Sequence, residues 1–248
     1  MKRAIALGLL WVVFCVLAFF PARWAGTFMP NSAKAVVPVS SINGTIWNGD
    51  AKIILPRTTW PMSAQYKLSP LKAISGGSFL DAVFSGQGLS AKGQFGFKNA
   101  QDVTARLNLN YLPISDPRLV GVQGDVVVTL DDLKISDRCD MAQGQVRTNM
   151  LAANEARWKW AGPILSGPIS CDGDALLMTI SGKDQDHDIK VDLRLYIEGR
   201  YDLDMRVNPI GVPQIGFEFV MSAMGFEEQP DGSSRLREQG QIFQGARG

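Results

Sequence analysis

The side chains best suited to catalysis or metal binding lie close together in one short segment, Lys183-Asp184-Gln185-Asp186-His187-Asp188. Its histidine, His187, is the single histidine of the sequence, and an imidazole beside carboxylates can act as a general base. The segment lacks the Gly and Glu spacing of an EF-hand, which argues against calcium. It separates two runs of alternating residues, so we interpret it as a polar hairpin loop that exposes His187 to solvent.

The other patterns that suggest an active site are incomplete. Asp131 and Asp132 are adjacent carboxylates, but neighbouring residues of a strand point to opposite faces of a sheet. The glycine pair at 76–77 and the Gly-Gln-Gly at 86–88 lack the helix and lysine of a phosphate-binding loop. The sequence contains neither Cys-x-x-Cys nor Gly-x-Ser-x-Gly. We therefore predict that the protein is not an enzyme and holds neither a metal nor a cofactor.

The three cysteines carry a different kind of chemistry. Cys15 lies within an apolar run, which leaves Cys139 and Cys171. An even pair of cysteines in an exported region favours a disulfide, because oxidising compartments preserve such bonds. Two buried free thiols are the alternative.

The N-terminus predicts the compartment. Lys2 and Arg3 precede an uncharged run over residues 4–20, which as a helix would rise about 25 Å. Arg23 and Trp24 suit the membrane interface, and the basic residues before the run favour a cytoplasmic N-terminus. We predict an uncleaved inner-membrane anchor over 1–24, a linker over 25–40 and a periplasmic domain over 41–248. A cleaved signal peptide is the alternative, although the residues after Phe20 suit cleavage poorly.

Composition limits the classes of function. Hydrophobic residues make up 46% of the 248 residues and charged residues 20%, which is typical of a folded, globular chain. The 25 glycines and 13 prolines favour many turns. The formal net charge of +1 gives no electrostatic signature of nucleic-acid binding, and we predict no nucleic-acid partner.

Alternation of apolar and polar residues dominates the exported region. Residues 103–111, 189–197 and 201–207 alternate most clearly, and the last two should form a hairpin through Glu198-Gly199-Arg200. Weaker strands are predicted at 42–48, 50–55, 62–68, 80–87, 91–97, 122–130, 142–149, 155–161 and 174–181. Helices are predicted only at 69–75 and 212–224. In the strand at 155–161, Trp158 and Trp160 would share one face and pack in the core.

These elements predict a mainly β fold, with a single transmembrane helix followed by a predominantly antiparallel sheet. Strands with one apolar face must bury it in a sandwich, a barrel or a curved trough, and periodicity does not choose among them. A trough left open would expose an apolar surface, which usually marks a partner or a ligand.

The stretch Ser41-Ile42-Asn43-Gly44-Thr45-Ile46-Trp47-Asn48-Gly49-Asp50 contains two turn signals. Asn-Gly is a strong hairpin signal, so we predict a turn at 48–50 between two strands. The motif residues Gly44, Thr45, Trp47 and Gly49 would then have structural roles, with Trp47 directed inward.

This Gly-Thr-aliphatic-Trp-x-Gly stretch, shortly after a single membrane anchor, resembles an element near the start of the type II secretion system protein N family. Three further stretches resemble that family: "LPRTTWPMSAQYKLSP" at 55–70, "WAGPILSGPISCDGD" at 160–174 and "MGFEEQPDGSSRLREQGQI" at 224–242. Related motifs occur in envelope β proteins of the AsmA/TamB type. In the resemblance, Cys139 is the expected partner of Cys171, and the chain ends in a hairpin and a terminal strand.

The resemblance implies an accessory inner-membrane component of a type II secretion system, which exports folded proteins. Its partners would be other components of that system, contacted in the periplasm through sheet edges or loops. The addition of a strand to an exposed sheet edge is the natural mode of contact for such a fold. The alternative is a carrier or bridge for lipid or another apolar ligand, with the sheet as a trough.

Overall fold

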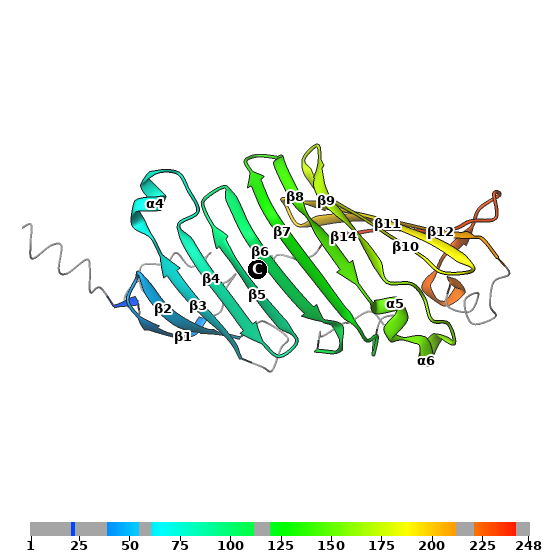
Figure 1. Cartoon of the computed structure of the whole chain (residues 1–248), viewed down its shortest axis with the longest axis horizontal. Coiled ribbons are helices and arrows are strands. Elements are labelled where there is room, and N and C mark those ends of the chain that lie inside the picture. Colours follow the sequence, from blue (N-terminus) through cyan, green and yellow to red (C-terminus); the bar gives the residue numbers. More distant parts are fainter. Residues whose placement is uncertain (1–20, 23–38, 55–60, 112–119, 212–220, 242–248) are drawn as a thin grey trace, which may run out of the picture. The chain divides into compact units, whose positions relative to one another are not determined.

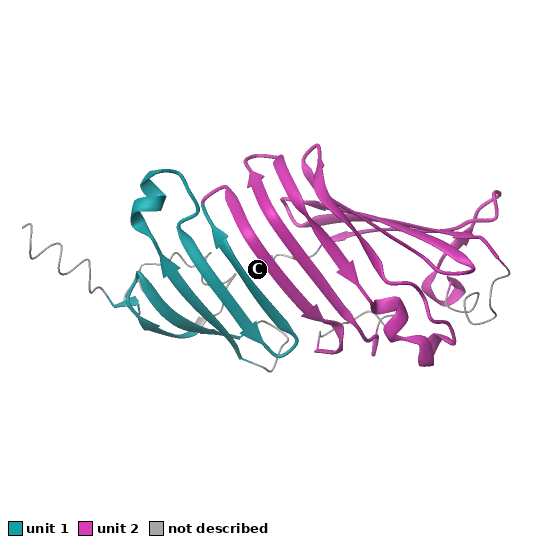
Figure 2. Ribbon diagram, viewed as in Figure 1, with its two compact units in different colours: residues 1–96 teal, residues 97–248 magenta. Residues whose placement is uncertain are grey.

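A computed structural model describes residues 21–22, 39–54, 61–111, 120–211 and 221–241. The described residues are mainly β, and every strand pair they form is antiparallel, as predicted. They divide into two compact units, residues 1–96 and 97–248 (Figure 2). Of the anchor predicted over 1–24, only residues 21–22 are described, and residues 25–38 of the linker predicted over 25–40 lie outside the described residues. Within the described ranges, no helix is long and apolar enough to span a membrane.

Unit 1 is a meander of five strands, each paired with the next along the chain. Its elements are β1 (Val39–Gly44), β2 (Asn48–Ile53), β3 (Met62–Leu68), α4 (Pro70–Ile74), β4 (Leu80–Gly86) and β5 (Leu89–Phe95). The short helix predicted at 69–75 is therefore confirmed, and Pro70 at its start suits a first helical turn. The core is small and consists of Ala51, Ile53 and Ala64, with Ile42, Met62 and Phe84 packed against it.

Unit 2 contains the longer strands. Its first elements are β6 (Asn99–Asn108), the 3-10 turn η1 (Leu109–Tyr111), β7 (Asp125–Ile135), β8 (Cys139–Thr148), α5 (Met150–Ala153) and α6 (Glu155–Trp158). They are followed by β9 (Leu165–Asp172), β10 (Ala175–Lys183), β11 (His187–Tyr196), β12 (Arg200–Pro209), β13 (Glu227–Glu228) and β14 (Ser234–Gln241). The strands pair in sequence order as far as β12, which is followed by β14 and then β13.

The sheet of unit 2 twists along its length. In Figure 1 the broad faces of β6, β7 and β8 are in view, whereas β10, β11 and β12 are seen closer to edge-on. The predicted hairpin is confirmed, because β11 and β12 pair from His187 with Pro209 to Leu195 with Tyr201. This register places the alternating apolar side chains of both strands on one face, so that Val191 lies opposite Met205.

That apolar face carries two clusters. The larger contains residues of β9, β11, β12 and β14 together with Leu151 of α5 and Trp158 of α6. Ile189 and Val207 are almost fully buried in it, with 0% and 1% of their surface exposed. The second cluster is centred on Leu130, Val146 and Ile169 of β7, β8 and β9. The helices α5 and α6 thus close one end of the face.

The strand predicted at 155–161 is wrong, because α6 occupies this segment and Lys159 has a left-handed backbone with φ of 55°. The cause lies just before it. The buried side chain of Asn154 accepts a hydrogen bond from Gln123 N and donates to Gln123 O and Met150 O, which holds a helical reversal between β8 and β9. Trp158 and Trp160 nevertheless belong to the core, as predicted, with 7% and 3% of their surface exposed.

Sequence reasoning also missed strand β9. Ser166 and Gly167 predict a turn, yet they lie opposite Arg147 and Val146 of β8. The bare backbone of Gly167 packs so closely on the carbonyl of Thr179 that a Cβ atom would overlap it. Close packing between two neighbouring strands, rather than a turn, therefore accounts for this glycine.

Candidate interaction sites

The Gly-Thr-Ile-Trp-Asn-Gly motif forms a tight hairpin end, which we call the Gly44 turn (residues 44–49). Gly44 pairs with Gly49 and has φ of 95°, a conformation that favours glycine. A Cβ atom at Gly44 would lie 2.5 Å from the carbonyl oxygen of Asn48. At Gly49, a Cβ atom would lie 2.8 Å from the hydroxyl of Tyr66. Both glycines are thus required by the close approach of other atoms.

The remaining bonds of the Gly44 turn converge on Thr45. Its hydroxyl accepts hydrogen bonds from the backbone amides of Trp47 (3.3 Å) and Asn48 (3.2 Å). Its carbonyl accepts a bond of 2.7 Å from the Tyr66 hydroxyl. Burial, and then the charge of Asp50, raise the pKa of Tyr66, so its hydroxyl stays protonated and able to donate.

The predicted position of the turn is therefore wrong. Asn48, Gly49 and Asp50 begin strand β2, and the chain reverses over residues 45–47. The Thr45 hydroxyl accepts hydrogen bonds from the amides of Trp47 and Asn48, and these local bonds override the Asn-Gly signal. Trp47 is half-buried, and its carbonyl accepts a bond of 2.7 Å from Leu68 N.

The Gly44 turn also contacts the chain that follows the apolar N-terminal run. Pro21 forms an isolated antiparallel bridge with Thr45, and Ala22 is buried with 3% of its surface exposed. Thr45 therefore has two roles: its hydroxyl closes the turn, and its backbone lies beside Pro21.

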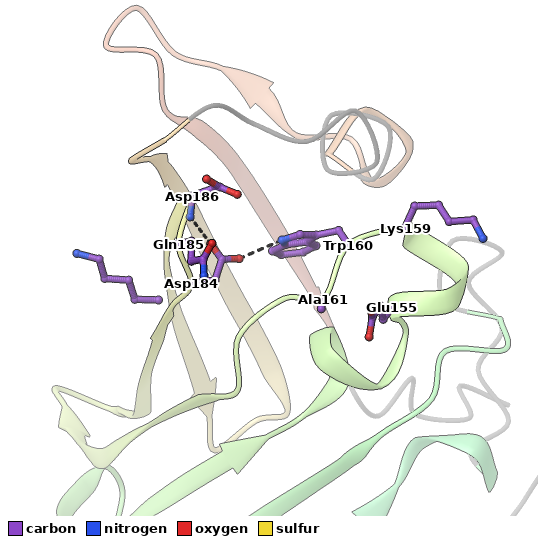
Figure 3. A pocket seen from close by; sticks show the side chains of 8 residues that line it. Glu155, Lys159, Trp160, Ala161, Asp184, Gln185 and Asp186 are labelled. Carbon is purple, nitrogen blue, oxygen red and sulfur yellow. Dashed lines mark hydrogen bonds between the residues drawn. The ribbon is translucent and has the colours of Figure 1, made fainter.

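A second turn, between β10 and β11, lies in the polar segment 183–188 and forms what we call the Asp184 corner (Trp160, Asp184, Asp186 and His187). One carboxylate oxygen of Asp184 accepts bonds from the amides of Asp186 (2.8 Å) and His187 (2.7 Å). The other accepts 3.0 Å from the indole nitrogen of Trp160, as Figure 3 shows, and lies 3.4 Å from Nδ1 of His187.

His187 does not lie in a solvated loop, contrary to the prediction. It begins β11, has 0% of its surface exposed, and meets the Trp160 ring edge-on at 5.5 Å between centroids. The alternating pattern of β11 starts earlier than expected, and this places the imidazole on the apolar face. The imidazole is therefore enclosed by the core.

The surface beside the Asp184 corner is hollowed, with a volume of about 590 Å³ (Figure 3). Its lining combines the turn with α6 and consists of Glu155, Lys159, Trp160, Ala161, Lys183, Asp184, Gln185 and Asp186. The two lysines and the carboxylates carry charges of both signs. Within the described ranges no three His, Cys, Asp or Glu side chains are grouped to bind a metal. The hydrogen bonds on Asp184 instead fix the turn to the core.

Cys139 and Cys171 form a disulfide, as predicted, with their Cα atoms 5.5 Å apart. Cys139 is the first residue of β8, and Cys171 lies near the end of β9. The pairing of these two strands ends at Gly144 and Ile169, and the disulfide joins the strands beyond that point.

Strand β14 lies between β12 and the two-residue strand β13 at one side of the sheet of unit 2. On its inner side β14 pairs with β12 along its whole length, from Ser234 with Val207 to Gln241 with Arg200. On its outer side, among the described residues, only β13 pairs with it, through Glu227 with Arg235 and Glu228 with Ser234. The edge from Arg237 to Gln241 therefore extends beyond β13.

A cluster of charges flanks this edge on the polar face of the sheet. Asp204 of β12 accepts a bond of 2.9 Å from Nε of Arg235 and a second, shorter one from its Nη2. Arg237 lies 3.5 Å from the same carboxylate. The bond from Arg235 outweighs burial and lowers the pKa of Asp204, so this carboxylate stays ionised. One carboxylate is thus shared by two guanidinium groups.

Sequence reasoning missed this edge cluster, because the terminal strand was expected only from the family resemblance. The signal is present in Ser234-Arg235-Leu236-Arg237, where a buried leucine lies between two arginines. Such alternation in a strand places both arginines on one face.

The described fold and sites define a protein with an extended antiparallel sheet, one brace between strands and a paired but incompletely covered edge. The sequence also matches a family model. The model of type II secretion system protein N matches residues 35–237, which are most of the chain. The chain therefore belongs to the type II secretion system protein N family, and membership implies association with other components of that system. Neither the curated proteins nor the solved structures give a match.

Proposed function

We propose that this chain is an accessory inner-membrane component of a type II secretion system that acts through protein contacts in the periplasm. The observation that carries the proposal is the outer edge of β14, which β13 covers only at its first two residues. An exposed strand edge presents a row of backbone donors and acceptors to an added strand. Family membership supplies the system in which the partner is found.

Two features support the periplasmic location. The disulfide between Cys139 and Cys171 is typical of an oxidising compartment. The apolar run at 4–20, preceded by Lys2 and Arg3, suits a single helix with its N-terminus in the cytoplasm. The intact mass of membrane-extracted protein tests the anchor, because removal of a signal peptide would lower the mass by roughly 2–4 kDa.

The Asp184 corner favours a protein-contact function over catalysis, because its ionisable side chains are engaged in the fold. Its carboxylate is used by two backbone amides, and its imidazole is enclosed by the core. A catalytic site needs an acid or base that meets the substrate. The β14 edge, in contrast, offers exposed side chains such as those of Gln239 and Gln241.

Deletion of the gene, combined with site-specific crosslinking, tests the proposal. We expect deletion to reduce the export of folded proteins by the type II system. A photo-crosslinking residue at Gln239 should capture another component of the system. The same residue at Gln145, exposed on β8 but with strands paired on both sides, is the matched control and should capture none. Unchanged export, or equal capture from both positions, would contradict the proposal.

A second candidate function is a carrier of lipid or another apolar ligand. It is favoured by the half-buried side chains that continue the apolar face beyond the closed cluster, namely Leu176, Met178, Leu193 and Leu195. The closed cluster under α5 and α6 favours the contact function, because it interrupts the face. A photoactivatable fatty acid given to cells separates the two, since a carrier would be labelled along β10, β11 and β12.

A further inference from the structure

Helix α4 of unit 1 carries two large apolar side chains that the fold does not bury. Leu71 and Ile74 have 81% and 85% of their surface exposed, more than any other large apolar side chain among the described residues of unit 1. Their spacing of three residues places them on the same side of the helix. An exposed apolar pair of this kind indicates contact with a surface outside unit 1.

The strand register places α4 at the same end of unit 1 as the Gly44 turn. Strand β3 ends at Leu68, whose amide donates a bond of 2.7 Å to the carbonyl of Trp47, and α4 begins two residues later (Figure 1). The turn at 87–88, between β4 and β5, lies at the opposite end of the same strands. The exposed pair therefore belongs to the end that contains the Gly44 turn.

This end of unit 1 is also attached to the chain that follows the apolar N-terminal run. The run at 4–20 ends immediately before Pro21, which pairs with Thr45 of the Gly44 turn. Residues paired in this way have Cα atoms about 5 Å apart. An apolar run that crosses the inner membrane as a helix would therefore hold the Gly44 turn at the membrane surface.

Helix α4 is within reach of the same surface. Leu71 follows Leu68 by three residues, and three residues span at most about 10 Å. The headgroup layer of a bilayer is itself roughly 5–8 Å thick on each side of the hydrocarbon core. A short helix beside the anchor can thus place its apolar side chains among the headgroups.

The apolar side chains, rather than charge, would supply most of this contact. In the connection from 69 to 79, Lys72 is the single charged residue, and its long side chain can extend toward headgroup phosphates. The neighbouring carboxylates belong to the sheet, where Asp81 lies opposite Lys67 and Asp50 lies opposite Gln65. The charges of this end are therefore balanced, and α4 itself has no carboxylate that anionic lipid would repel.

The anchor makes so small an apolar surface sufficient. Two side chains alone would bind a membrane weakly, because the binding strength of an interfacial helix increases with its buried apolar area. A chain that is already anchored meets the membrane intramolecularly, at a high effective concentration. The contact then needs only enough free energy to select one orientation of unit 1.

We propose that this end of unit 1 rests on the periplasmic surface of the inner membrane, with Leu71 and Ile74 inserted among the lipid headgroups. The exposed apolar side of α4 is thus covered by the lipid from which the anchor emerges. Attachment at both Pro21 and α4 fixes the orientation of unit 1, with the turn at 87–88 directed away from the membrane. The inference rests on the proposed inner-membrane location and adds a lipid contact that the location does not require.

Fluorescence quenching tests the contact with the full-length chain in vesicles of phosphatidylethanolamine and phosphatidylglycerol. Cys15→Ala removes the one cysteine outside the disulfide, so that a single introduced cysteine can be labelled with bimane. Ser75→Cys places the label at the exposed end of α4, and Gln87→Cys places the matched control label at the opposite end of the strands. Lipids with a nitroxide on the headgroup should quench the α4 label and leave the control label bright.

Removal of the apolar pair is the decisive variant. When Leu71→Ser and Ile74→Ser are combined, quenching of the α4 label should fall to the level of the control label. The melting temperature in detergent should stay within about 2 °C of the wild type, because both side chains are exposed in the folded chain. Val83→Ser is the control, because Val83 is 47% exposed in the middle of β4, and it should keep the wild-type quenching.

A charge change on α4 gives a second, independent readout. Lys72→Glu adds a carboxylate to the helix, and anionic headgroups repel it. Quenching of the α4 label should therefore decrease more in vesicles that contain phosphatidylglycerol than in vesicles of phosphatidylcholine alone. An equal decrease in both would contradict the insertion of α4 among charged headgroups.

Three further results would overturn the inference. They are equal quenching of both labels, quenching of the α4 label that survives loss of Leu71 and Ile74, and a signal that follows the protein-to-lipid ratio rather than the nitroxide lipid. The last would assign the apolar side of α4 to a second copy of the chain.

Failure of the lipid contact is distinguishable from failure of the proposed function. If crosslinks from Gln239 reach a secretion component while the α4 label is not quenched, the function stands and the lipid contact does not. If the α4 label is quenched but deletion of the gene leaves export unchanged, the lipid contact stands and the proposed function fails.

Discussion

The Gly44 turn of unit 1 and the Asp184 corner of unit 2 use the same local bonds with different consequences. In each, a side-chain oxygen accepts the amides two and three residues later, Thr45 from Trp47 and Asn48, and Asp184 from Asp186 and His187. A hydroxyl has one oxygen, which the local bonds use. A carboxylate has two, and the second oxygen of Asp184 binds the distant Trp160.

The difference explains how firmly each turn is held. Trp160 and His187 are buried with 3% and 0% of their surface exposed, and the corner belongs to the larger core. Trp47 is only half-buried, and the core of unit 1 is built mainly from alanines. The Gly44 turn relies instead on close backbone contacts and on Tyr66. One turn is therefore held by side-chain packing and the other by backbone geometry.

The largest effect is expected at the Asp184 corner. Trp160→Ala removes a buried indole and the bond to Asp184, and should cost roughly 3–5 kcal/mol of unfolding free energy, the usual range for a buried aromatic residue. Trp160→Phe keeps most of the packing and should cost less. Urea unfolding measures both. A loss below about 1 kcal/mol in Trp160→Ala would show that packing does not hold the corner.

The disulfide is the next largest contribution to unit 2. Replacement of Cys139 and Cys171 by alanine should cost about 3–4 kcal/mol, the range for a closed loop of this length. Alkylation of the unreduced, denatured wild type should modify Cys15 alone. If the double variant has the same unfolding free energy as the wild type, the disulfide does not stabilise unit 2, and side-chain packing alone distinguishes it from unit 1. Modification of all three cysteines would contradict the bond.

A smaller effect is expected from the backbone contacts of the Gly44 turn. In Gly49→Ala, the new methyl group would lie against Tyr66 and the carbonyl of Asn43, so we expect a loss of roughly 1–3 kcal/mol, as for overpacking elsewhere. Gly77→Ala is the control, because its methyl group would make only ordinary contacts. Amide exchange within β1 and β2 reports the loss locally. Equal behaviour of the two variants would refute the close approach at Gly49.

Sequence patterns predicted the strands well because alternation records which face is buried. Strands β6, β11 and β12 follow directly from it. Trp158 and Trp160 are buried as predicted, although a helix and the residues after it, rather than the predicted strand, place them in the core. Patterns failed where one residue's contacts came from a distant segment. Asn154 holds α6 through bonds to Gln123, and Asp184 binds both the amide of His187 and the indole nitrogen of the distant Trp160. The edge cluster depends on β14 lying beside β12, which no local pattern contains.

The smallest effect is expected from Trp47, and it decides what the Gly44 turn is for. Its half-buried indole should contribute roughly 1–2 kcal/mol, less than a fully buried one. Trp47→Ala would then lower the melting temperature by a few degrees, since 1 kcal/mol corresponds to about 2–4 °C at this size. A structural role predicts that export falls only as far as the folded protein is lost.

A binding role predicts a different result for the same variant. If the exposed part of Trp47 docks a partner, Trp47→Ala would leave the melting temperature within about 1 °C of the wild type and would still abolish export. Trp47→Phe separates the two roles further, because it retains an aromatic ring for packing but loses the indole N–H. The bond from Leu68 N to the carbonyl of Trp47 does not depend on the side chain, so both variants should keep the turn itself. The Gly44 turn would then hold the Trp47 side chain where a partner can contact it, whereas the Asp184 corner buries Trp160.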